Sequence, residues 1–132
     1  MNFSEYQKAS YRAIQDHESK KEEVMHWAIG LGEEAGEVLS VIKHRYYAGS
    51  FELEDLVGEL GDVLWHIAAL CTTCNIDLQK VAEYNIAKLN HRYPSGHFDT
   101  DRSYARNELD KEFEQTMVAR ELIEEIARNG GM

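Results

Sequence analysis

The stretch "GLGEEAGEV" (Gly30–Val38) contains three glutamates and neither lysine nor arginine. It lies within residues 22–46, where apolar side chains recur every three or four positions, and this period predicts a helix. Glu34 and Glu37 are three positions apart, so they share one face of that helix. Four positions beyond each of them stands a valine rather than a cation. The segment therefore predicts a helix with two unpaired acids on one face.

The same spacing recurs in "GELGDVLWH" (Gly58–His66), where Glu59 and Asp62 fall in a second predicted helix, residues 53–74. The centre between the two acidic pairs is Ala48, inside the best turn candidate. Two helices packed antiparallel about that turn would bring all four carboxylates level. Clustered anions among apolar neighbours repel one another unless a cation neutralises them. Hard oxygen ligands suit Mg²⁺ or Mn²⁺, so the spacing favours a metal site, with a solvated acidic face as the alternative.

The remaining sequence also has helical periodicity, with one proline and no sustained alternation of apolar and polar residues. The predicted helices are residues 3–16 with Ser4 as N-cap, 22–46, 53–74, a segment from the cap Asp77 to His91, and a tail helix from Asn107 to the closing glycines. The sequence therefore predicts an all-α fold, an antiparallel helical bundle of four to five helices.

Small residues with one tryptophan line the side of the third helix opposite its apolar stripe. They are Gly58, Gly61, Trp65, Ala68 and Thr72. Such a surface suits close helix packing rather than solvent. A chain this short has few other helices to cover both sides of one helix. We therefore expect a homo-oligomer, a dimer or tetramer, whose subunits complete one bundle.

Length and charge limit the classes of function. The chain has 132 residues, the size of one domain, and a net charge of −10. Such a charge disfavours binding to nucleic-acid polymers, whose phosphates repel it. No apolar run is long enough for a membrane span and no secretory leader opens the sequence, so we expect a cytoplasmic protein without a membrane partner.

Taken together, four segments resemble the MazG-like nucleotide pyrophosphohydrolases, a branch of the all-α NTP pyrophosphatases. They are "MNFSEYQKAS", "GLGEEAGEVLSVIK", "LVGELGDVLWHIAAL" and "VAEYNIAKLNHRYPSGHF" followed by "DRS". The family pattern of ExxE, then ExxD, then K…RYP…G occurs here in order. The resemblance covers Met1 to Arg106, which predicts a MazG-like domain over residues 1–107 and an acidic helical tail over 108–132.

The resemblance implies hydrolysis of a nucleoside triphosphate to the monophosphate and pyrophosphate with Mg²⁺, for which Mn²⁺ can substitute. The implied metal ligands are Glu34, Glu37, Glu59 and Asp62. The implied phosphate contacts are Lys88, Arg92 and Tyr93, and Asn85 shares a helix face with the first two.

Three further residues are candidates with an open alternative. Glu33 stands where many relatives have a small residue, and it either assists the attacking water or a further metal, or is a solvated neighbour of the site. Trp27, seven positions before Glu34, either stacks on the nucleobase or belongs to the core. Lys43, towards the end of the same helix, is a weaker substrate-binding candidate.

The residue pattern leaves the base and the sugar open, although the family includes free-standing phage enzymes that prefer (d)GTP. Within the same fold, phosphoribosyl-ATP pyrophosphohydrolase is the second reading. A non-catalytic interaction module, with the acids as a solvated patch, is the alternative from another class.

Overall fold

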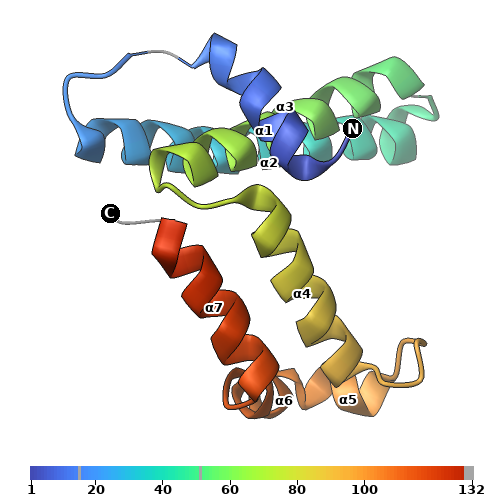
Figure 1. The fold of residues 1–132 in the computed structure, drawn as a ribbon. Helices are drawn as coiled ribbons and strands as arrows, with labels where there is room; N and C mark the ends of the chain where they lie inside the picture. The colour runs from blue at the N-terminus through green and yellow to red at the C-terminus, as the bar shows by residue number, and fades with distance from the viewer. Residues whose placement is uncertain (15, 51, 130–132) are drawn as a thin grey trace. The chain divides into compact units, whose positions relative to one another are not determined.

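The computed structural model describes residues 1–14, 16–50 and 52–129, and the regular structure in these ranges is entirely helical (Figure 1). The prediction of an all-α fold is confirmed. The chain forms two compact units, Met1–Cys74 and Asn75–Met132. No described helix has both the length and the hydropathy needed to cross a membrane.

The first unit is built on a pair of long helices. Its elements are α1 (Phe3–Ser10), a 3₁₀ turn (Tyr11–Ala13), α2 (Lys20–Ala48) and α3 (Leu53–Thr73). Helices α2 and α3 pack against each other and run in opposite directions (Figure 1). Gly49 ends α2 in the left-handed conformation, with φ of 80°, which glycine adopts without steric cost. The two predicted long helices are present, and α2 extends two residues further at each end than predicted.

The beginning of α1 differs from the prediction. Asn2, not Ser4, is the N-cap: its side chain accepts a hydrogen bond from the Glu5 backbone N–H at 2.8 Å. The Glu5 carboxylate in turn accepts from the Asn2 backbone N–H at 2.8 Å, which completes a capping box. Helix α1 also ends earlier than predicted, at Ser10, and residue 15 of the predicted span lies outside the described residues.

Helix α1 covers part of the α3 side that we expected a second subunit to cover. Ala68 is fully buried, and the Gln7 side-chain amide donates to the Thr72 hydroxyl at 3.0 Å. Helix α1 of the same chain therefore supplies part of the packing that we expected from a second subunit. Gly58 and Gly61, nearer the start of α3, remain exposed. The homo-oligomer itself stays a prediction.

The second unit contains α4 (Leu78–Arg92), α5 (Thr100–Tyr104), α6 (Arg106–Glu114) and α7 (Met117–Asn129). The side chain of Asp77 accepts from the Gln79 backbone N–H at 2.9 Å, as its predicted role of N-cap requires. Both α6 and α7 pack against α4, with Phe113 and Ala119 buried.

The single tail helix that we predicted is divided in two. The interruption lies at Thr116. The hydroxyl of Thr116 accepts a hydrogen bond from the Ala119 backbone N–H at 3.2 Å, so this residue acts as the N-cap of a new helix, α7. The predicted boundary between residues 107 and 108 falls within α6. A separate role for residues 108–132 stays a prediction.

Candidate metal centre

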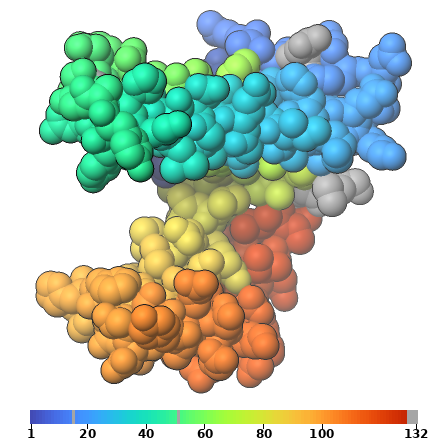
Figure 2. All heavy atoms as spheres, turned by 180° about the vertical axis from the view of Figure 1, so that it is seen from behind, coloured from blue at the N-terminus to red at the C-terminus, as the bar shows by residue number. Residues whose placement is uncertain are grey.

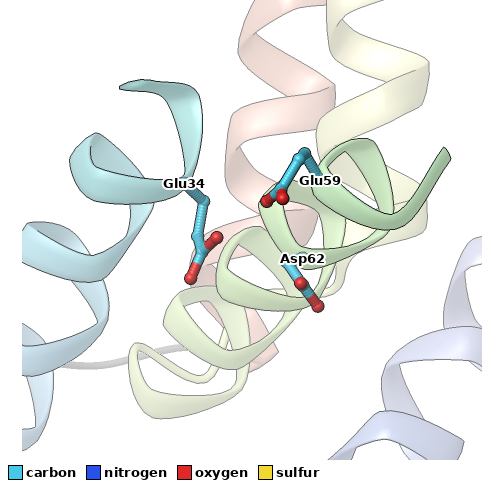
Figure 3. A group of neighbouring side chains, drawn as sticks. All are labelled: Glu34, Glu59 and Asp62. Atoms are coloured by element: carbon cyan, nitrogen blue, oxygen red, sulfur yellow. The ribbon is translucent and has the colours of Figure 1, made fainter. Parts of the chain in front are cut away.

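Three of the predicted metal ligands converge in the first unit. One carboxylate oxygen from each of Glu34, Glu59 and Asp62 lies within 4.8 Å of the others. Glu34 projects from α2 towards the two acids on α3 (Figure 3). Glu34 and Glu59 are half-buried, and Asp62 is exposed. The antiparallel packing of α2 on α3 therefore brings together side chains that are about 25 positions apart in the sequence.

The electrostatics of this cluster centre on Glu59. Partial desolvation, followed by the negative charges of Glu37, Glu34, Asp62 and Asp55, raises the pKa of the Glu59 carboxyl. Glu37 is thus close enough to act on Glu59 electrostatically, although it is exposed and outside the group of three. Each of these charges disfavours a further anion and favours a cation. The donor set, all carboxylate oxygen, fits a hard divalent ion.

His66 ties Asp62 to the interior of the unit. Its ring nitrogen Nδ1 lies 2.9 Å from the backbone oxygen of Asp62. A carbonyl oxygen can only accept, so Nδ1 carries a proton and donates it to this hydrogen bond. The His66 side chain is 7% exposed. It therefore fixes the α3 backbone beside one of the three clustered acids.

Two residues near the acids were missed by sequence reasoning. Burial and the negative charge of Asp62 raise the pKa of Tyr6, which places this α1 side chain close to the cluster. Asp55 is the second, because it adds to the negative potential at Glu59. The helical spacing of four between Asp55 and Glu59 was a usable signal. No signal in the sequence pointed to Tyr6, because its position depends on how α1 packs on α3.

The predicted phosphate contacts lie in the second unit. Along α4, Asn85 is exposed and Lys88 is half-buried. Arg92, in the last turn, forms a two-pronged ion pair with Asp110 of α6: Nη2 lies 2.6 Å from Oδ2 and 2.8 Å from Oδ1. Tyr93 follows directly, with its ring 5.6 Å from that of Phe98. In this arrangement Arg92 already holds a carboxylate.

The family model of the "MazG nucleotide pyrophosphohydrolase domain" matches residues 20–97, more than half of the chain. The chain belongs to this family. The matched range contains the three clustered carboxylates and the α4 residues, so the resemblance noted in the sequence is confirmed. Helix α1 and helices α5 to α7 lie outside it.

One similar protein with a curated description is the Gene 37 protein of Mycobacterium phage L5. It is 37% identical over 73 residues, which is 52% of this chain and 64% of the relative. The chain therefore matches somewhat less than two thirds of that protein's length. No solved structure matches the chain.

The remaining candidates on α2 are not among the three clustered carboxylates. Glu33 and Lys43 are exposed. Trp27 is 1% exposed, with its ring edge-on to Trp65 at 5.4 Å and to His66 at 5.5 Å between ring centroids. Stacking of Trp27 on a nucleobase would therefore require this aromatic cluster to open, and the packing seen here is that of a core residue.

Proposed function

We propose that this MazG-family protein hydrolyses a nucleoside or deoxynucleoside triphosphate to the monophosphate and pyrophosphate, for control or sanitation of nucleotide pools. One observation carries the proposal: the convergence of Glu34, Glu59 and Asp62 within 4.8 Å, inside the region that the family model matches. An acidic surface alone would not need to bring half-buried carboxylates from two helices together.

The proposed metal ligands are these three acids together with Glu37, and the proposed ion is Mg²⁺ with Mn²⁺ as a substitute. A bound divalent ion would neutralise phosphate charge and lower the pKa of a water molecule. The chain's own contribution is to hold the carboxylates in place. His66 fixes the backbone at Asp62, and the negative charges around Glu59 keep the cluster selective for cations. Glu33, exposed and next to Glu34, is proposed as an accessory group for the attacking water.

The proposed phosphate contacts are Lys88, Arg92 and Tyr93, with Asn85 on the same face of α4. Cationic donors stabilise the charge that develops on the leaving pyrophosphate. The reaction as proposed uses water as the nucleophile, so it requires no covalent enzyme intermediate. Among substrates, (d)GTP is proposed for the first test, because free-standing phage enzymes of this type prefer it.

The proposed assembly is a homo-oligomer acting in the cytoplasm on free nucleotides rather than on a nucleic-acid polymer. Large apolar side chains remain exposed on α2, among them Met25, Ile29 and Leu39, at 51%, 63% and 70%. Their spacing of four and ten positions places them on one side of the helix. Figure 2 shows α2 running along the first unit from end to end, with its outer face uncovered. A second copy packed there would remove these side chains from water.

The deciding experiment incubates the purified protein and Asp62→Asn with Mg²⁺ and each common NTP and dNTP, and with phosphoribosyl-ATP, and separates all phosphate products. Monophosphate and pyrophosphate in equal amounts, formed by the wild type alone, are expected. Diphosphate with orthophosphate would contradict the proposed bond cleavage. Turnover of phosphoribosyl-ATP instead would move the protein to that reaction, and absence of all turnover would favour an interaction module.

A further inference from the structure

The ion pair between Arg92 and Asp110 joins a residue inside the MazG match to one outside it. The Arg92 Nη2 contacts both carboxylate oxygens of Asp110, at 2.6 and 2.8 Å, and Nε contacts Oδ1 at 3.2 Å. Both side chains are largely buried, at 16% and 25% exposed. The Asp110 carboxylate is the main reason that the pKa of Arg92 lies above its usual value.

The packing of α6 on α4 holds Asp110 at this place. Phe113 lies one turn beyond Asp110 on the same face of α6, is 3% exposed, and packs its ring against Tyr84 at 5.3 Å and His91 at 5.9 Å. Arg102 of α5 approaches from another side, where it donates to the backbone oxygens of His91 and Arg92. The pair is therefore supported by apolar packing that does not depend on its charges.

The geometry of the pair is the one that arginine uses for phosphate. The guanidinium presents Nε and Nη2 as a fork that fits two oxygens of either a carboxylate or a phosphate. In this structure that edge of Arg92 is filled by Asp110. A phosphate group that used the same edge would have to displace the carboxylate.

We propose that Asp110 is an internal competitor of the triphosphate for Arg92, and that α6 thereby lowers the protein's affinity for its substrate. The inference rests on the proposed function only in taking Arg92 as a phosphate contact. Substrate binding then exchanges one ion pair for another: Arg92 releases a carboxylate of charge −1 and receives a phosphate oxygen of the more highly charged triphosphate.

The size of the effect follows from how often Arg92 is free. An apparent dissociation constant is the intrinsic one divided by the fraction of molecules competent to bind. An ion pair that is formed most of the time leaves about a tenth to a third of the molecules competent. Removing the charge of Asp110 should therefore tighten phosphate binding by about three- to tenfold.

The test compares wild type, Asp110→Asn and Glu112→Gln as intact proteins, with inorganic tripolyphosphate and Mg²⁺ as the probe in titration calorimetry. Glu112 is the matched control, because it lies on the same helix, is 64% exposed and contacts His91 rather than Arg92. Asp110→Asn keeps the side-chain volume and is expected to lower the dissociation constant by about three- to tenfold. Glu112→Gln should leave it unchanged. Adding Arg92→Ala to Asp110→Asn should abolish the gain.

Unchanged or weaker binding by Asp110→Asn, with native helicity by circular dichroism, would overturn the proposal and make Asp110 an orienting partner of Arg92. Asp110→Ser serves as the second variant if the asparagine protein fails to fold. Nucleotide turnover is assayed separately. Tighter tripolyphosphate binding by Asp110→Asn without turnover of any nucleotide would reject the proposed reaction but retain the competition. Nucleotide turnover with unchanged tripolyphosphate binding would retain the proposed reaction but reject the competition.

Discussion

His66 of α3 packs its ring directly onto the backbone of Gly30 in α2. A methyl group at Gly30 would lie 2.5 Å from Nε2 and 2.6 Å from Cδ2 of that ring, closer than real contacts allow. Gly30 is one turn before Glu34, and His66 is one turn after Asp62, whose backbone oxygen its Nδ1 contacts. The contact therefore sets how closely α2 and α3 approach beside the carboxylate cluster.

Gly30→Ala should destabilise the protein, although alanine is the better helix former. The imidazole is buried and contacts the rings of both Trp27 and Trp65, so it cannot move without disturbing them. We expect a loss of about 1–3 kcal/mol in the free energy of unfolding, as for other overpacked sites. Urea denaturation measures it.

Gly32→Ala is the matched control for that change, since a Cβ at Gly32 meets nothing within 4 Å. It should stabilise the same helix by about 0.5–1 kcal/mol. Mn²⁺ affinity, measured by electron paramagnetic resonance, should fall in Gly30→Ala and stay unchanged in Gly32→Ala. Equal effects of the two substitutions on stability would show that the His66 contact does not constrain the helices.

Asp62→Asn should remove turnover while leaving the helices intact. The substitution keeps the side-chain volume and takes away one of the crowded negative charges around Glu59, so the metal-free fold has no reason to weaken. Mutation of residues that only hydrogen-bond to metal ligands already costs about 10- to 100-fold in metal affinity or activity. Loss of a ligand itself should therefore cost at least about 100-fold in kcat. Steady-state assays with circular dichroism check both parts.

Glu54→Gln provides the control for Asp62→Asn, because Glu54 is an exposed acid on the same helix. It should retain wild-type turnover. Loss of helicity in Asp62→Asn would mean that the acid is structural rather than a ligand.

The convergence of Glu34, Glu59 and Asp62 could be predicted from the sequence because two local rules determine their positions. A spacing of three places each pair on one helix face, and the short connection between α2 and α3 sets their register. Periodicity could not show the break in the tail, since apolar residues recur at helical spacing on both sides of Thr116. The interruption comes from one hydroxyl that caps α7.

Contacts between segments that are distant in the sequence could not be predicted from helical spacing and periodicity. Nothing local marks Tyr6 as a neighbour of Asp62, or Asp110 as the partner of Arg92. The role of Asn2 as the cap of α1 is also a matter of partners, because Asn2 exchanges hydrogen bonds with Glu5. Spacing predicts which residues share a face, and packing decides what that face meets.

The metal-free protein should lose stability as the pH rises through the titration of Glu59. Desolvation and neighbouring acids raise the pKa of this carboxyl in the folded state, so the folded protein binds the proton more tightly than the unfolded chain does. Its contribution to stability is therefore largest below the ordinary glutamate pKa of about 4.3 and is lost as the pH rises through the raised folded value.

Glu59→Gln removes that dependence. In the presence of a chelator, this variant should melt at a higher temperature than wild type at pH 7, and the difference should vanish towards pH 4. Melting curves across this pH range measure it. A glutamine variant that is less stable at every pH would show that the Glu59 carboxylate makes a favourable contact in the metal-free fold. The same variant should gain less thermal stability from Mn²⁺ than wild type does.

Lys88→Gln should weaken triphosphate binding without weakening metal binding, because the proposed role of Lys88 is to contact phosphate. We expect the KM for the substrate to rise by about tenfold or more, the loss of one charged hydrogen bond. Lys80→Gln is the control on the same helix: Lys80 already pairs with Glu83 at 2.8 Å and Glu125 at 2.9 Å. Its loss should lower stability slightly and leave KM unchanged. If Lys88→Gln reduced Mn²⁺ affinity as strongly as it raised KM, or if Lys80→Gln raised KM equally, α4 would not present Lys88 to the substrate.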